Sequence, residues 1–280
     1  MHFGGYEIES TYDGSSIVIL PVPYDETSTY IRGADKGPEA ILEASPNLEY
    51  YDIETAGDIR HHGIFTLDPV REKSSPEALC NAVEKEVIDL LNGKKFPVVI
   101  GGNHSVSIGA FRAAGKFFKD LSILQLDAHS DLRPEYEGSP LNHACAMARA
   151  IEVAPVTHIG IRSMCTEELQ LVDNDRFFPA YRLYYDKSLY RKAIGTLKKN
   201  VWITIDLDVL DPSVMPSTGT PEPGGPDYME LMHFLRDVAA ERNVVGFDVV
   251  ELCPAAHNKM PDFVAAKIVY QLLSYIFHRR

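Results

Sequence analysis

Short apolar runs separated by helical patterns constrain the fold of this chain most. The runs are rich in Val and Ile and lack polar alternation, which predicts strands buried on both faces of a parallel sheet. They lie at 17–22, 98–101, 122–126, 157–161, 182–185, 201–205 and 244–249. Helices are expected near 38–44, 75–91, 106–118, 144–152, 167–173, 187–198, 227–241 and 261–277. This order of elements predicts a three-layer α/β/α sandwich around a mostly parallel central sheet.

The composition excludes several classes of protein. No linker, repeat or change of composition divides the 280 residues, so residues 1–280 are expected to form a single domain. The net charge of −13 argues against a nucleic-acid binder and is compatible with a cationic substrate. No apolar stretch reaches the ~20 residues of a membrane span. The N-terminus lacks the pattern of a signal peptide, and the four cysteines form no CxxC pair, so a cytoplasmic protein with reduced thiols is expected.

Metal-binding residue types follow the ends of three predicted strands. Alternate residues of an extended chain point to the same side, and ligands of such folds bind beyond the carboxyl ends of the strands. The candidate ligands are His104 after the first strand, Asp127, His129 and Asp131 after the second, and Asp206 and Asp208 after the third. We therefore expect these six side chains to form one site at one edge of the sheet.

The chemistry of this set favours two divalent cations. Six ligands exceed the four that a zinc site takes. An oxygen-rich set with some imidazole favours Mn²⁺, with Fe²⁺, Co²⁺ or Ni²⁺ as alternatives. Four crowded carboxylates repel one another unless cations are present, and two divalent ions balance their charge. Cations of this kind can make a hydroxide nucleophile available at neutral pH. The structural alternative, in which each acid caps a turn, explains a single aspartate better than this constellation.

Several separated motifs resemble those of the ureohydrolase family, which includes arginase and agmatinase. Residues 101–105 (GGNHS) resemble GG[DE]HS, and residues 127–131 (DAHSD) resemble DAHxD. Residues 206–225 resemble DxDxxDP followed by GTPEPGG, and residues 22–38 resemble VPxD followed by RxGxxxGP. The segment 160–163 (GIRS) also fits. The resemblance covers the chain from residue 17 to about residue 254, and it implies the arginase/deacetylase-like fold.

The resemblance implies two manganese ions per chain. One would be held by His104, Asp127, Asp131 and Asp206, and the other by Asp127, His129, Asp206 and Asp208. The implied reaction hydrolyses a guanidinium to an amine and urea. A hydroxide that bridges the two ions, beside Asp131, would be the nucleophile.

Two further residues resemble catalytic residues of the family. His143 resembles the histidine that shuttles a proton, and its ordinary pKa of about 6.5 suits this role. The alternative is a residue at the start of the helix capped by Asn142. Glu251 resembles the glutamate that orients the guanidinium, since a carboxylate accepts paired N–H bonds from a planar fork. The alternative is a surface acid at the end of a strand.

The substrate is expected to be selected by the loop 132–140. Arg133 replaces the Asn that arginases use there, and Glu135 and Glu137 can face a distal amine instead. The motif that contains Glu222 also looks more like agmatinase than arginase. We therefore expect agmatine to be converted to putrescine and urea, a step of polyamine biosynthesis. Aminopropylagmatine is nearly as plausible, followed by guanidinobutyrate or arginine, for which Arg133 would pair with the carboxylate.

Two residues depart from the family pattern, and two other classes of protein stay open. Asn103 stands where an acid is usual, so weaker metal binding is expected, and Asn103→Asp should tighten it. Cys253 stands where agmatinase-like sequences more often carry Asn. The alternatives are a single-zinc amide hydrolase of deacetylase type and an inactive metal-binding homologue. The family resemblance also suggests a trimer or hexamer.

Overall fold

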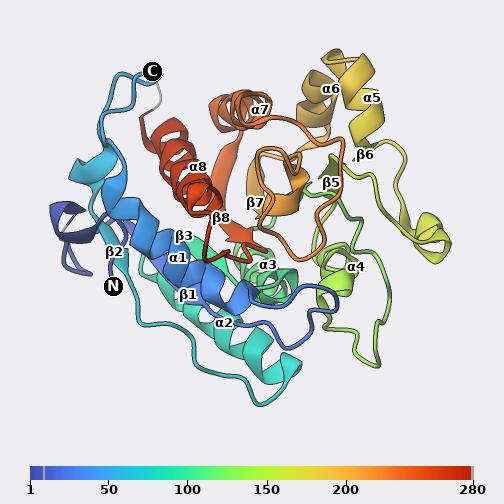
Figure 1. Cartoon of the computed structure of the whole chain (residues 1–280), viewed down its shortest axis with the longest axis horizontal. Coiled ribbons are helices and arrows are strands. Elements are labelled where there is room, and N and C mark those ends of the chain that lie inside the picture. The colour runs from blue at the N-terminus through green and yellow to red at the C-terminus, as the bar shows by residue number, and fades with distance from the viewer. Residues whose placement is uncertain (9, 279–280) are drawn as a thin grey trace.

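A computed structural model describes residues 1–8 and 10–278 of the chain. Its centre is one sheet of eight strands in the order β2-β1-β3-β8-β7-β4-β5-β6, and every neighbouring pair is parallel (Figure 1). The strands are β1 (Ile17–Val22), β2 (Ile64–Thr66), β3 (Phe96–Gly101), β4 (Leu121–Leu126), β5 (Val156–Ile159), β6 (Phe177–Phe178), β7 (Asn200–Asp206) and β8 (Asn243–Val250). The expected sandwich around a parallel sheet is confirmed.

Helices cover both faces of the sheet, as Figure 1 shows. One face packs on α1 (Gly37–Ala44), α6 (Ser188–Thr196), α7 (Tyr228–Glu241) and α8 (Met260–Phe277). The other packs on α2 (Pro76–Asn92), α3 (Ser107–Phe117) and α4 (Ala146–Ala150). Within β3, Val98 and Ile100 face the first layer while Val99 faces the second. This burial of both faces explains the uninterrupted apolar runs of the sequence.

The structure corrects several expected elements. Residues 182–185 were expected as a strand, but they lie in α5 (Ala180–Tyr185), which buries Ala180 and Leu183 and exposes Tyr181, Tyr184 and Tyr185. The three-residue spacing of the buried pair is helical, and it overrides the strand preference of the tyrosines. The edge strands β2 and β6 were missed because runs of two or three residues carry no readable periodicity.

Short helices also differ from expectation. The helix expected at 144–152 is a 3₁₀ turn, η6 (His143–Cys145), followed by α4, and the helix expected at 167–173 is the 3₁₀ helix η7 (Thr166–Leu171). None of the helices in the described part of the chain combines the length and hydropathy that crossing a bilayer requires.

The order of the central strands positions the site. β3, β8, β7 and β4 are consecutive neighbours, so their carboxyl ends meet at the middle of one sheet edge. Leu126 of β4 pairs with Ile205 of β7, which brings the residues that follow them together. Strands far apart in the sequence therefore place the charged residues at and after their carboxyl ends close together.

Candidate metal centre

His104 lies at the centre of a group of carboxylates. Gly102 lets the chain turn after β3, because a Cβ there would come within 1.9 Å of the Tyr24 carbonyl oxygen. The buried imidazole then points its Nδ1 at three carboxylates, 3.1 Å from Asp127, 3.1 Å from Asp131 and 3.3 Å from Asp206. Nδ1 makes no hydrogen bond to any described residue. A buried nitrogen without a hydrogen bond among carboxylates is the arrangement that a cation would complete.

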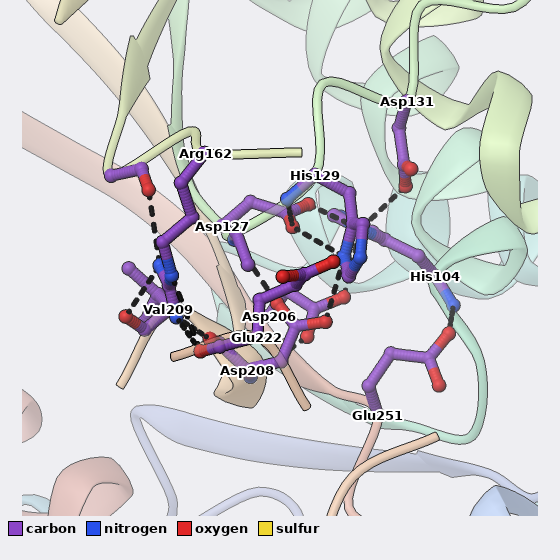
Figure 2. A network of polar contacts seen from close by, with 12 residues as sticks. His104, Asp127, His129, Asp131, Arg162, Asp206, Asp208, Val209, Glu222 and Glu251 are labelled. Atoms are coloured by element: carbon purple, nitrogen blue, oxygen red, sulfur yellow. Dashed lines mark hydrogen bonds and ion pairs between the residues drawn. The ribbon is translucent and has the colours of Figure 1, made fainter. Parts of the chain in front are cut away.

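A second group of ligand atoms adjoins the first. The His129 Nδ1 lies 2.9 Å from Asp208 Oδ2 and 3.7 Å from Asp127 Oδ1. Two sets of ligand atoms close enough to share a cation result, His104 with Asp127 and Asp206, and His129 with Asp127 and Asp208. Asp127 belongs to both sets, and Figure 2 shows its side chain beside these histidines and aspartates. Asp131 completes the surroundings of His104.

The electrostatics of these groups favour bound cations. Burial, together with the charges of Asp208 and Asp131, raises the pKa of Asp127 to about 7. Burial and neighbouring aspartates also hold the pKa of Asp206 well above its ordinary value. Burial acts to raise the pKa of Asp208 too, but the nearby His129 outweighs it and lowers that pKa to about 2. The carboxylates therefore cannot all ionise freely, and the donor set fits two divalent cations.

The backbone is strained at two site residues. Asp131 has a φ of 51° and Glu251 a φ of 66°, in the left-handed region that residues other than glycine rarely adopt. The carbonyl of Asp131 accepts hydrogen bonds from Met147 and Ala148, and the amide of Glu251 donates to the Gly102 carbonyl at 2.7 Å. The extended alternation expected along 127–131 therefore does not persist, since Asp131 reaches His104 through a turn. Strain of this kind, about 1–3 kcal/mol per residue, is typical of functional sites.

A cleft of about 260 Å³ opens onto the two groups of ligands. His143 and Glu251 line the cleft. Four candidate ligands line it too, namely His129, Asp131, Asp206 and Asp208. Its remaining walls include Thr29, Arg133, Tyr136, Met164, Cys165, Glu168 and Thr220. The cleft is large enough for a small molecule that is held against the metal ligands.

His143 faces the cleft from the start of η6. The Asn142 side chain caps this turn by accepting a hydrogen bond from Ala144 N at 3.1 Å, so the cap role belongs to Asn142 and not to His143. The ring stands edge-on to Tyr136, with 6.2 Å between centroids. Burial lowers the pKa of His143, while Asp131 acts to raise it. A histidine that can gain or lose a proton therefore lies at the wall of the cleft.

Glu251 connects the cleft to the metal ligands. One of its carboxylate oxygens accepts a hydrogen bond from the His104 amide at 2.8 Å, as Figure 2 shows. The side chain lines the cleft, and burial raises its pKa to about 8. One oxygen thus fixes the side chain in place, and the other is left for a ligand.

The three acids expected to take part in substrate binding, Glu135, Glu137 and Glu222, are not among the residues that line this cleft. Glu135 and Glu137 are exposed on the loop after Asp131, and neither is among the residues that line the cleft. Glu222 accepts hydrogen bonds from Arg162 through its backbone carbonyl, at 2.8 and 3.2 Å. Their expected role in substrate binding stays a prediction.

Arg162 clamps three loops beneath the site. Its guanidinium donates to the carbonyls of Gly160, Asp208, Val209, Leu210, Glu222 and Pro223. Figure 2 shows the guanidinium to the left of Asp208, where it meets the backbone carbonyls of the neighbouring loops. The motif 160–163 was noticed in the sequence without a role, and the structure supplies one. Glu168, which was not singled out, is buried and accepts from the amides of Leu132 and Cys165, so it ties two walls of the cleft together.

A row of buried polar side chains crosses the sheet beneath the ligands. His158, Gln125, Thr204 and Asp248 pair in register across β5, β4, β7 and β8. Gln125 donates to Asp127 Oδ2 at 2.8 Å and contacts His158 Nδ1. Thr204 lies 2.8 Å from His104 Nε2. We call these four residues the polar row. Polar residues within apolar strands are the sequence signal of such a row, since buried polar groups need partners.

Asn103 forms hydrogen bonds to residues other than the candidate ligands. Its amide nitrogen donates to the hydroxyls of Thr27 at 2.8 Å and Ser28 at 3.2 Å, and its oxygen caps the turn at Ser105. None of these bonds reaches a candidate ligand, so the structure gives Asn103 no hydrogen bond through which it would polarise the metal site, and its expected effect on metal affinity stays a prediction. Cys253 is also explained in part, because its thiol donates to the Arg32 carbonyl beside Gly33.

Comparisons with known proteins agree with this geometry. The model of the arginase family matches residues 15–274. The N(1)-aminopropylagmatine ureohydrolase of Synechocystis is 37% identical, over 96% of this chain and 92% of its own length. The agmatinase of Halalkalibacterium halodurans is 36% identical, over 94% of this chain and 93% of its own length. The structure of agmatine ureohydrolase from Thermoplasma volcanium has a TM-score of 0.88 at 31% identity, and it covers 98% of this chain and 94% of that one.

Proposed function

The chain belongs to the arginase family, whose members are ureohydrolases, and from this premise we propose that it is a two-manganese hydrolase converting agmatine to putrescine and urea. The observation that carries the proposal is the pair of ligand groups that share Asp127, since His129, Asp206 and Asp208 of these groups line the cleft. A single-zinc amide hydrolase needs neither His104 nor four aspartates.

We assign the two cations to two overlapping sets of ligands. His104, Asp127, Asp131 and Asp206 would hold one cation, and Asp127, His129, Asp206 and Asp208 the other. The pairing of His104 with Asp127, Asp131 and Asp206 within 3.3 Å supports the first set. When bound, the cations supply the positive charge that makes water a nucleophile at neutral pH.

The residues of the cleft perform the remaining chemistry. A guanidinium is a poor electrophile because its charge is delocalised, so it must be held still beside the water. Glu251 would accept N–H bonds from the guanidinium fork with its free oxygen, and Asp131 would accept a hydrogen bond from the attacking water. His143 would deliver a proton to the departing amine nitrogen. The guanidinium and one water thus give one ammonium and one urea.

The choice of substrate rests on the loop sequence and on named relatives. Arg133 in place of Asn removes the arginase pattern for an α-amino acid. Relatives at 36–37% identity are named as an agmatinase and as an N(1)-aminopropylagmatine ureohydrolase. The second name makes aminopropylagmatine the second candidate, since it shares the guanidinobutyl group with agmatine.

Urea release from the Mn²⁺-loaded protein tests the proposal. Agmatine, aminopropylagmatine, guanidinobutyrate and arginine should be compared at equal concentration. The proposal predicts the highest kcat/KM for agmatine, and a higher value for aminopropylagmatine would select the second candidate. Preference for guanidinobutyrate or arginine would contradict the assignment and favour Arg133 as a partner of a carboxylate. Urea from none of them would favour an inactive homologue.

A further inference from the structure

Asp248 lies buried under the metal centre and contacts no candidate ligand directly. It is fully buried on β8, and its register partner on β7 is Thr204. Its Oδ1 lies 2.7 Å from Ser107 Oγ and 2.5 Å from Thr204 Oγ1, and its Oδ2 lies 2.6 Å from Trp202 Nε1. The carboxylate is thus surrounded by three hydrogen-bond donors and is itself an acceptor only.

The direction of each hydrogen bond follows from this arrangement. A carboxylate has no proton to give, so the Thr204 hydroxyl donates its single proton to Asp248. The Thr204 oxygen is then left as an acceptor for the His104 Nε2 at 2.8 Å, and Nε2 must carry a proton. With Nε2 protonated, a neutral imidazole has its lone pair on Nδ1. That atom faces Asp127, Asp131 and Asp206 and has no hydrogen bond within the described chain.

We propose that Asp248 and Thr204 are positioning residues that hold the proton of His104 on Nε2 and so direct its Nδ1 lone pair to a cation. This inference rests on the proposed function, because it takes His104 as a ligand. We call the chain of hydrogen bonds from Asp248 through Thr204 to His104 the relay. It joins β8, β7 and the turn after β3, so it fixes both the tautomer and the orientation of the His104 ring. Partners of this kind change metal affinity by about 10–100-fold.

The substitution Asp248→Asn reverses the relay with almost no change in shape. Trp202 Nε1 can only donate, so it holds the amide oxygen of the new Asn at the Oδ2 position. The amide nitrogen then occupies the Oδ1 position and donates to Thr204. The Thr204 hydroxyl turns its proton toward His104 Nε2, which favours a proton on Nδ1, the atom needed for the cation.

Two measurements on the full chain test this direction. Mn²⁺ affinity is measured by the electron paramagnetic resonance of free Mn²⁺ in titrations of the metal-free protein. The proton on His104 Nε2 is detected in long-range ¹H–¹⁵N spectra of the metal-free protein at a pH at which the imidazole is neutral. This pH is alkaline, because burial lowers the pKa of His104 but Asp127, Asp131 and Asp206 outweigh it and hold that pKa well above its ordinary value. Asp248→Asn should weaken one of two Mn²⁺ sites by about 10–100-fold and remove the Nε2 proton signal. Thr204→Val should also weaken that site, whereas Thr204→Ser, which keeps the hydroxyl, should restore both readouts.

Controls separate this inference from folding and from the proposed function. Thr157→Val removes a buried strand hydroxyl that pairs with Thr196 away from the site, and it should leave both readouts unchanged. An Asp248→Asn protein that keeps the Nε2 proton and wild-type Mn²⁺ affinity would overturn the inference. Equal weakening in Thr204→Ser and Thr204→Val would overturn it too, because the hydroxyl would then be irrelevant. A wild-type protein that binds no Mn²⁺ would instead refute the proposed function.

Discussion

Replacing Arg162 by lysine keeps the positive charge beside Asp208 but removes the guanidinium. The substitution therefore isolates the contribution of the guanidinium hydrogen bonds to stability. The guanidinium contacts six carbonyls, and several of the distances are short, such as 2.7 Å to Asp208 and 2.8 Å to Glu222. A guanidinium has five N–H donors and a lysine ammonium has three, so at least two donors are lost.

The expected magnitude follows from these bonds. A hydrogen bond to a charged group contributes about 1.5–3 kcal/mol, so two lost donors amount to about 3–6 kcal/mol. Arg162 is half-buried and water from the cleft can replace part of this loss, which favours the lower end, about 3 kcal/mol. With a urea m-value of about 3 kcal/mol/M, the midpoint of unfolding should fall by about 1 M. The cation that we assign to Asp208 should also bind more weakly, because residues 208–210 lose the hydrogen bonds that anchor them.

Urea denaturation of the metal-free protein measures this change, and Mn²⁺ titration measures the second effect. Arg112→Lys is the matched control, because Arg112 makes one exposed ion pair, with Glu77 at 3.1 Å, and its midpoint should move little. If Arg162→Lys unfolds at the wild-type midpoint, the charge of Arg162, and not its guanidinium hydrogen bonds, stabilises the three loops.

Three further predictions follow from the site. Glu251→Gln should lower kcat/KM for the guanidino substrate by about 10–100-fold, because it removes the charge but keeps an acceptor for the His104 amide; unchanged kinetics would exclude its proposed role. His143→Asn should lower kcat by about 10²–10⁴-fold while Mn²⁺ affinity, measured by titration, stays the same; a parallel loss of Mn²⁺ would assign His143 to the metal. In EDTA the stability should fall as the pH rises from about 4 to 8. The folded-state pKa values of Asp127 and Glu251, about 7 and about 8, lie above those of the unfolded chain, so the folded state binds more protons in this window. Urea unfolding at pH 5 and pH 8 tests this, and a midpoint that rises with pH would contradict it.

Part of the site was predictable because it depends on strand ends. The candidate ligands and Glu251 follow predicted strands, and His143 was expected from the family resemblance. The structure places four of the ligands, His143 and Glu251 along one cleft, and the ligand groups that include them also contain His104 and Asp127. Parallel strands place their carboxyl ends at one edge of the sheet, whatever the connections between them. The prediction that these residues lie close together therefore did not depend on knowing the order of the strands. The edge strands and the helix at 180–185 were not predicted correctly, because the conformation of short segments depends on tertiary packing.

The supporting residues were not predictable from motif or periodicity. The clamp by Arg162 depends on three loops that meet only in the folded chain, and the turn at Asp131 depends on a left-handed backbone. The polar row did leave a trace, since Gln125, Thr204 and Asp248 interrupt apolar strands. Which partner each of these residues has depends on the strand order, and the sequence pattern does not reveal that order.

Urea release from agmatine during titration of the metal-free protein with Mn²⁺ tests the central claim most directly. Two overlapping groups of ligands predict that urea appears with agmatine and that the rate stops rising at two Mn²⁺ per chain. A rate that stops rising at one ion per chain, or no urea at any Mn²⁺ concentration, would contradict the two-cation account.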